Sequence, residues 1–356
     1  MLEAAVPLPV VALVLTLMTV SPSPDRVVRD PRVGESSGLA VSLRHRGVLW
    51  THNDSGTDGV LFALAADGRT AARVRLKGVA TYDWEAMAAY RDAAGRPMLA
   101  VADIGDNRAE RPSVRIVTLP EPDLRNGTVT PSRVLRLTYP HGAVDAETLL
   151  VAPDGKRAYL VTKGFGSTIY EVPQAVWTSA TATTATLVTV ATVPLLLVTD
   201  GVMGPGGHPL LRTYSTLAVL PPLTGAVAGG ALGPLAETGL PDQKQGESLT
   251  LRDASTALVG SEGTGQAILR VPLPEEMLAA LRPEPARGAA AGGPAPGDPA
   301  PGGPGSSPGS GGGLWGGVSR WVPVGGAVLL AGSVLTLILR RGRRGGPRRS
   351  GPSTRR

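Results

Sequence analysis

Five segments of the chain repeat one pattern: an acidic residue, a short apolar run, a turn, and a second apolar run that ends in polar residues. The acidic residues lie 47 to 62 residues apart, and each opens a unit that continues with further short apolar runs. The units begin at Glu35, Glu85, Glu147, Asp200 and Glu247. A repeat of roughly 40–50 residues made of short strands is typical of propeller blades. The pattern therefore predicts an all-β fold, a single β-propeller.

The number of blades follows from the units that can be counted. Five are visible, and we favour five blades. A sixth is possible in the long interval between Glu85 and Glu147 or around residues 175–200. The last unit has only three strand-like runs, so residues 25–33 (DRVVRDPRV) are expected to add its outer strand and close the ring. Residues 275–282 carry the one helical pattern of the domain.

The two ends of the chain do not resemble a globular domain. Residues 4–20 are apolar, and they predict a signal peptide over residues 1–24, although no basic residue precedes them. An uncleaved N-terminal membrane anchor is the alternative. The propeller is expected over residues 25–282, followed by a stalk rich in Pro and Gly over residues 283–320.

A second apolar segment, residues 321–339, contains 19 uncharged residues and predicts a transmembrane helix. Eight arginines follow it in residues 340–356, and basic residues next to a span mark the cytoplasmic side. We therefore expect a single-pass membrane protein with an extracellular propeller. Its basic tail would lie against the inner leaflet.

Charge and cysteine content exclude some classes of function. The eight tail arginines exceed the net charge of +6, so the rest of the chain is slightly acidic and nucleic acid is not an expected partner. The chain has no cysteine, which excludes disulfides and thiolate metal sites.

The propeller fold predicts where polar side chains gather. In a blade the first strand is innermost and the second runs back beside it, so the start of one and the end of the other share a face. The candidate binding residues at the channel mouth are Glu35, Glu85, Glu147, Asp200 and Glu247 at the strand starts. At the ends of the second strands they are His52, Asn53, Asp54, Asp103, Asp106, Asn107, Lys163, Arg212 and Glu262.

This set holds nine carboxylates and two cations, and crowded carboxylates need compensation. Three arrangements provide it. The acids accept backbone N–H groups as a structural device, or a hard cation lies among their oxygens, or Lys163 and Arg212 neutralise part of the ring and bind an anionic group of a ligand. Catalytic acid/base work is a further candidate role for these acids. Ca²⁺ is the one cofactor that such oxygen donors suggest. Its expected ligands are Glu35, Glu85, Asp103 and Glu147.

The motifs ESSGLAVS, HNDSG, DWEAMAAY, VADIGDN, DAETLL and QGESL together resemble exported actinobacterial propellers of the YVTN/WD40-like and quinoprotein-dehydrogenase-like superfamilies. The resemblance covers residues 33–274. It is uninformative about activity, because most of these proteins have no assigned reaction. A more distant resemblance is to phytase-like and esterase-like propellers. In those propellers, acidic residues at the channel mouth bind calcium and basic residues hold phosphate. The resemblance implies that calcium would be bound in this chain by Glu35, Asp54, Glu85, Asp103, Glu147 and Glu247, and phosphate by Lys163 and Arg212.

Two functions from different classes follow. The first is a cell-surface binding or interaction module, whose ligand is a protein, a glycan or a small molecule. The alternative is a calcium-dependent phosphoesterase or esterase with its site at the acidic mouth. The sequence does not decide whether the protein is an enzyme.

Overall fold

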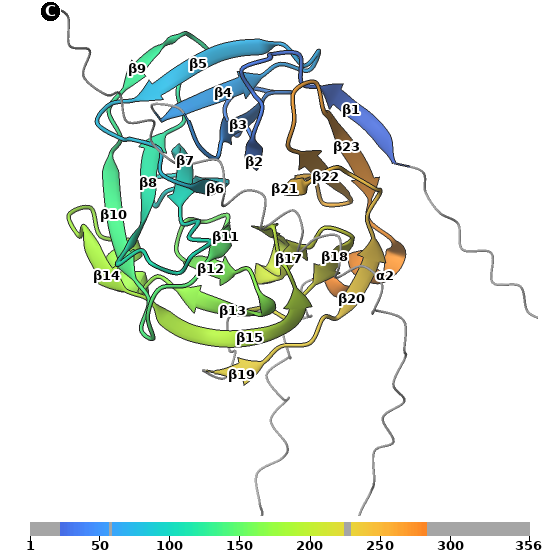
Figure 1. Ribbon diagram of the computed structural model, residues 1–356. Helices are drawn as coiled ribbons and strands as arrows, with labels where there is room; N and C mark the ends of the chain where they lie inside the picture. Colours follow the sequence, from blue (N-terminus) through green and yellow to red (C-terminus); the bar gives the residue numbers. More distant parts are fainter. Residues whose placement is uncertain (1–21, 57–58, 224–228, 283–356) are drawn as a thin grey trace, which may run out of the picture. The chain divides into compact units, whose positions relative to one another are not determined.

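The computed structural model describes residues 22–56, 59–223 and 229–282, which form five small sheets arranged in a ring (Figure 1). The prediction of a five-bladed, all-β propeller is confirmed, and the sixth blade is absent from the described residues. The predicted signal segment 1–24 lies almost wholly outside the described residues. The stalk, the predicted transmembrane helix 321–339 and the basic tail lie outside them entirely. Within the described ranges, no helix has the length and apolar character needed to cross a membrane.

Each blade is built from four antiparallel strands. Blade one contains β2 (Ser36–Val41), β3 (Leu49–Asn53), β4 (Val60–Leu64) and β5 (Thr70–Leu76). Blade two contains β6 (Trp84–Arg91), β7 (Pro97–Asp103), β8 (Val114–Pro120) and β10 (Arg133–Thr138). Blade three contains β11 (Ala146–Val151), β12 (Ala158–Thr162), β13 (Phe165–Glu171) and β15 (Val188–Leu196). Blade four contains β16 (Asp200–Met203), β17 (Pro209–Arg212), β18 (Thr216–Val219) and β20 (Ala236–Gly239). Blade five contains β21 (Gly246–Asp253), β22 (Thr256–Ser261), β23 (Ala267–Pro272) and β1 (Ser23–Val27).

Burial differs between the inner and the outer strands, and it explains their composition. The second strands β3, β7 and β12 are buried on both faces or nearly so, which is why they are continuous apolar runs. The outer strands β5 and β10 alternate between buried and more exposed positions, because one face meets solvent. Neighbouring blades pack through hydrophobic clusters, such as the one that joins Trp50 of blade one to Trp84 and Leu99 of blade two.

The ring is closed by the N-terminal strand, as predicted. β1 pairs antiparallel with β23 of the last blade, from Ser23 opposite Arg270 to Val27 opposite Ala267. The strand begins at Ser23, two residues before the predicted start of the domain. The Asp25 carboxylate accepts hydrogen bonds from Arg26 (2.8 Å), Arg252 (2.5 Å) and Arg270 (2.8 Å), so β1 is held to blade five by charge as well as by its ladder.

Three blades carry a fifth strand that was not predicted. β9 (Gly127–Val129), β14 (Thr184–Thr186) and β19 (Gly230–Ala231) each pair in parallel with the outer strand of the preceding blade. Each comes from the connection before the fourth strand of its own blade. These strands therefore link neighbouring blades at the circumference of the ring (Figure 1).

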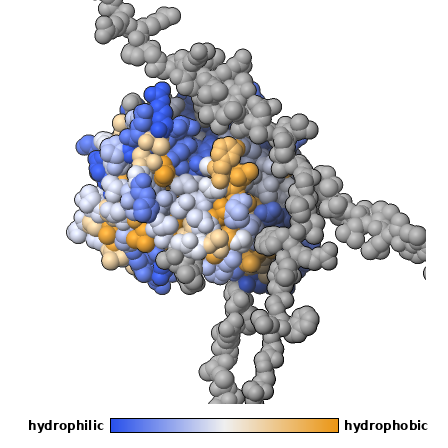
Figure 2. All heavy atoms as spheres, turned by 60° about the horizontal axis from the view of Figure 1, so that its bottom comes forward, coloured by the Kyte–Doolittle hydropathy of each residue, from blue (hydrophilic) through white to orange (hydrophobic). Residues whose placement is uncertain are grey.

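Helices are short. The predicted helix is confirmed as α2 (Glu275–Ala280), whose Met277 joins a hydrophobic cluster with Leu210 and Leu217 of blade four. α1 (Gln174–Trp177) and the 3₁₀ turn at Pro205–Gly207 were not predicted. On the side of the propeller seen in Figure 2, hydrophobic surface occurs in separate groups among polar residues.

Candidate functional site

The channel mouth is the side of the ring at which the five inner strands begin, and we call it the mouth side. The structure shows that the acidic residues there occupy two different positions. In blades one, two, three and five, the residue after the second strand donates its backbone N–H to the carbonyl just before the first strand, at 3.0–3.1 Å. This bond joins Asp54 to Glu35, Ile104 to Asp83, Lys163 to Asp145 and Glu262 to Gln245. Glu35 is therefore equivalent to Asp83 and Asp145, and not to Glu85 or Glu147.

The second acidic position lies two residues further along, inside a β-bulge. Glu85, Glu147 and Glu247 each fall at a register shift between the inner strand and its neighbour. A bulge redirects the side chain that it carries, and here the three carboxyl groups come together in the channel. The equivalent residue of blade one is Ser37, whose Oγ donates to Glu247 Oε2 at 3.3 Å. The prediction of one acidic row was wrong, because Glu35 belongs to the other row.

Lys163 compensates part of this charge. Its Nζ lies 2.8 Å from Glu147 Oε1 and 5.6 Å from the centroid of the Tyr214 ring. Burial lowers the pKa of Lys163, but Glu147, Tyr214 and Glu247 outweigh it and raise that pKa well above its usual range. Lys163 therefore stays charged.

The carboxyl groups of Glu85 and Glu147 are shifted toward the neutral form. Burial raises the pKa of Glu147 to about 8, although Lys163 opposes this. Burial, with Glu147, Asp83 and Glu247 nearby, raises the pKa of Glu85 well above its usual range. We refer to Glu85, Glu147, Glu247, Lys163 and Tyr214 as the channel cluster.

Asp200 and Arg212, both predicted for the site, instead join blade four to blade five. The buried Asp200 carboxylate accepts the N–H groups of Gly201 (2.8 Å) and Leu249 (2.6 Å). Arg212 is also buried and donates to the carbonyls of Ser248 (2.8 Å) and Gly260 (3.0 Å). Burial lowers the pKa of Arg212 to about 10. The expectation that Arg212 holds an anionic ligand group was wrong, because its donors are used within the fold.

The predicted residues of blade one form a turn. Asn53 Oδ1 accepts the N–H groups of Gly34 and Glu35 at 3.2 Å, and its Nδ2 donates to the Arg32 carbonyl at 2.8 Å. Glu35 accepts the Ser55 hydroxyl at 3.0 Å. The Asp54 N–H makes the backbone bond to Glu35 described above, so its backbone belongs to the same turn.

His52 and Glu262 also lie inside the fold. His52 is buried with its ring edge-on to Trp84, 5.4 Å between centroids, and burial lowers the pKa of His52 to about 4. A neutral buried ring in this position is a core side chain. Glu262, in blade five, accepts a hydrogen bond from the Gln245 side chain at 2.8 Å.

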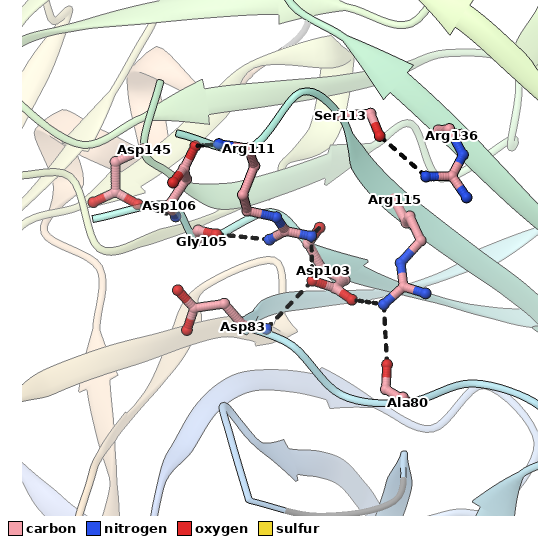
Figure 3. Close-up of polar contacts among 10 residues, drawn as sticks. All are labelled: Ala80, Asp83, Asp103, Gly105, Asp106, Arg111, Ser113, Arg115, Arg136 and Asp145. Atoms are coloured by element: carbon pink, nitrogen blue, oxygen red, sulfur yellow. Dashed lines mark hydrogen bonds and ion pairs between the residues drawn. The ribbon is translucent and has the colours of Figure 1, made fainter. Parts of the chain in front are cut away.

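The DIGDN segment of blade two (103–107) is organised by arginines that the sequence reading did not include. The buried Asp103 carboxylate binds Arg111 (2.7 Å) on one oxygen and Arg115 on the other (Figure 3). Asp106 accepts the N–H groups of Glu110 (3.0 Å) and Arg111 (2.8 Å), and its own N–H donates to Asp145 at 2.7 Å. The segment is therefore a rigid loop support, with Asn107 exposed at its end.

The arrangement does not fit the expected calcium site. Of its four proposed ligands, Asp103 is bound by two arginines, Glu147 by Lys163 and Glu35 by Ser55. In residues 22–56, 59–223 and 229–282, no group of three or more His, Asp or Glu side chains is arranged to hold a metal ion. No chemical step is therefore assigned to a metal.

A surface pocket of about 610 Å³ lies on the mouth side of blade two. It is bordered by the loop before β6, the loop between β7 and β8, and the ends of β8 and β10. Tyr82, Arg108, Arg111, Ser113, Arg115 and Arg136 are among its lining residues. Of the predicted residues, Asp106 and Asn107 line it.

Five residues of the mouth were not singled out from the sequence: Asp83, Asp145, Tyr214, Arg111 and Arg115. One signal was present for two of them. The motifs DWE (83–85) and DAE (145–147) place an aspartate two residues before the bulge glutamate, which marks both acidic positions at once. The arginines follow a turn and carry no pattern of their own.

The fold and its mouth define a five-bladed β-propeller with a charge-rich channel entrance. Among solved structures, the chain is similar to a protein of Xanthomonas campestris described as a gluconolactonase. The two are 16% identical with a TM-score of 0.35, over 71% of this chain and 95% of that chain. At this level the likeness gives no argument about function. No protein-family model and no curated protein matches the chain, so the resemblance to exported actinobacterial propellers stays a prediction.

Proposed function

We propose that the protein is a binding module that takes a small polar ligand on the mouth side of the propeller. The observation that supports this most is the pocket of about 610 Å³ on blade two. Its volume is in the range of small-molecule sites, roughly 300–1,000 Å³. Loops held by a rigid scaffold commonly carry binding residues, and the Asp103 and Asp106 contacts hold these loops.

The channel cluster has a supporting role in this proposal. Three glutamates of the cluster are almost completely buried: at most 5% of the surface of Glu85, Glu147 or Glu247 is exposed. Buried polar groups with internal partners fix the position of the strands around them. The cluster is thus the rigid centre around which the binding loops are arranged.

The binding module is proposed to face the outside of the cell on a single membrane span, residues 321–339. An epitope tag placed after Arg356 tests this topology. The tag should be reached by antibody only after the cells are permeabilised. A tag accessible on intact cells would contradict the proposed orientation.

Binding is tested on the full-length chain in detergent with a panel of neutral and charged mono- and disaccharides and organic acids, by calorimetry. At least one member should bind, and Ser113→Trp, which fills the pocket, should abolish its binding. Ser132→Trp is the control, because Ser132 is exposed near the start of β10 at the opposite side of the propeller. Equal loss in both variants, or no binding by any member, would contradict the proposal.

A second candidate is a hydrolase of phosphate or carboxylic esters at the channel mouth. It is favoured by the raised pKa of Glu147, about 8, because a carboxyl group that is protonated near neutral pH can serve as a general acid. The glutamate would protonate the leaving oxygen while water attacks the ester, and the proton that the attacking water loses would return to the glutamate carboxylate. Turnover of phosphate or acyl esters that falls about 100-fold in Glu147→Gln would favour this candidate. No turnover by the wild-type protein would exclude it for those esters.

A further inference from the structure

The six pocket residues Tyr82, Arg108, Arg111, Ser113, Arg115 and Arg136 form what we call the arginine pocket. Four cationic side chains converge on one cavity of a domain whose charge is otherwise slightly acidic. Such a concentration of arginines needs either acidic partners in the protein or an anion from outside.

Two of the four arginines have such partners. Arg111 and Arg115 both point toward Asp103 (Figure 3). Arg111 also donates to the Gly105 carbonyl at 2.6 Å, and Arg115 donates to the Ala80 carbonyl at 3.0 Å. Each arginine is thus fixed in direction, yet Arg115 uses only one of its terminal nitrogens among the described residues, so its other donors remain for a ligand.

The other two arginines are not neutralised. Within the described part of the chain, the Arg136 side chain has one hydrogen-bond partner, the Ser113 hydroxyl at 3.1 Å, and neither Arg136 nor Arg108 forms an ion pair. Both are exposed. Their guanidinium groups are therefore free to meet an incoming anion.

Acidic residues also line the pocket, and their negative charge opposes the binding of an anion. They are Asp83, Asp106 and Glu110. The Asp106 oxygens already accept two backbone N–H groups, and Asp83 is engaged within the fold. Glu110 is exposed at the rim. Most of the acidic oxygens are thus occupied, whereas two of the four arginines are unpaired.

We propose that the arginine pocket binds the phosphate or carboxylate group of a sugar-sized ligand. This rests on the proposed binding function and names its ligand class. The planar guanidinium group of Arg136 suits bidentate contact with an oxyanion through Nε and Nη2, and Nη1 of Arg115 adds a further donor. The Ser113 hydroxyl adds a donor. Tyr82 is 66% exposed with its ring 4.5 Å from Arg111 Cζ, and it offers a flat face for the rest of the ligand.

The test measures binding of glucose 6-phosphate, glucuronate and glucose to the full-length chain in detergent by calorimetry. At least one anionic sugar should bind, glucose should not, and the affinity should fall as salt is raised. Inorganic phosphate should compete with a phosphorylated ligand. The tighter of the two anionic sugars identifies whether phosphate or carboxylate is preferred, and either result supports the proposal.

Arg136→Gln should weaken the binding about tenfold, since one charge-assisted contact is lost. Arg46→Gln is the matched control, because Arg46 is exposed in the β2–β3 turn on the opposite side of the propeller. Binding of glucose as tight as that of the anionic sugars would overturn the ligand class and leave the binding function standing. An anion affinity that is unchanged in Arg136→Gln would likewise overturn the proposed ligand site and leave the binding function standing. If neutral sugars bind in the wider panel but no anion does, this inference alone fails.

Discussion

Nζ of Lys163 lies 2.8 Å from Oε1 of Glu147, and this ion pair provides the only positive charge of the channel cluster. The neighbouring carboxyl groups of Glu85 and Glu247 come from two other blades. Arg212 adds no neutralising contact to them, because its donors reach the backbone of blade five. One cation therefore lies among three buried carboxyl groups, and the raised pKa values of Glu85 and Glu147 favour the protonated form of these two.

The first prediction concerns Glu85. Its folded pKa lies well above the ordinary value of 4.5, so the folded state holds a proton that the unfolded state releases as the pH rises. The stability of the wild-type protein should therefore decrease with rising pH above about 4.5. Glu85→Gln imitates the protonated form, so it should match the wild type at pH 5 and melt at a higher temperature than the wild type at pH 9.

Thermal unfolding between pH 5 and pH 9 measures this difference. Glu110→Gln is the control, because Glu110 is exposed at the pocket rim. Melting curves of Glu85→Gln and wild type that stay parallel over the whole range would contradict the expected proton uptake.

The second prediction concerns the strand that closes the ring. Burial alone would raise the pKa of Asp25, but hydrogen bonds from Arg270 and Arg26 hold that pKa below its ordinary value of 3.8. Its contribution is therefore present above pH 3.8 and is lost as the pH falls through the lower folded pKa. Asp25→Asn should destabilise the protein by about 2 kcal/mol at pH 7. Urea unfolding at pH 7 and pH 3 checks this, and the cost should shrink at pH 3.

The third prediction concerns the contribution of Arg212 to the stability of the fold. Arg212→Ala leaves the buried carbonyls of Ser248 and Gly260 without a donor, so it should cost roughly 3–5 kcal/mol of unfolding free energy. Gly246→Ala should also destabilise, because an added Cβ would lie 2.2 Å from Arg212 Nη2. Chemical denaturation measures both. Arg46→Ala is the exposed control, and an equally stable Arg212→Ala protein would show that these contacts contribute little.

The fourth prediction concerns calcium. Since three of the four expected ligands, Asp103, Glu147 and Glu35, are bound to arginine, lysine and serine side chains, the melting temperature should be the same with EDTA and with added Ca²⁺. Thermal melts of the full-length chain and metal analysis measure this. A shift of several degrees on chelation would restore the calcium hypothesis.

The sequence was sufficient for the blades because their repeating apolar runs depend on burial within each sheet. It also predicted the closing strand, since an unpaired edge at blade five needed a partner. It did not predict β9, β14 and β19, which are two or three residues long and depend on the neighbouring blade for their pairing. Residues this few carry no periodicity.

The site was predicted less well, and the reason is the bulge. An extra residue at the start of the innermost strand shifts the register. The sequence repeat therefore aligns Glu35 with Glu85, whereas in the structure Glu35 occupies the position of Asp83. Likewise, Lys163 and Arg212 look equivalent in sequence. Lys163 contacts a carboxylate, whereas Arg212 donates to backbone carbonyls. Only the packing of adjacent blades decides between these partners.

The pairing of β1 with β23 has a consequence for the order in which the chain can fold. Asp25 and Arg270 are 245 residues apart, so the first strand to be synthesised waits for the last blade before it finds its partner. Contacts so distant in sequence form slowly. Closure of the ring should then be a late folding event. A chain truncated before blade five cannot close the ring, because β1 has no strand to pair with.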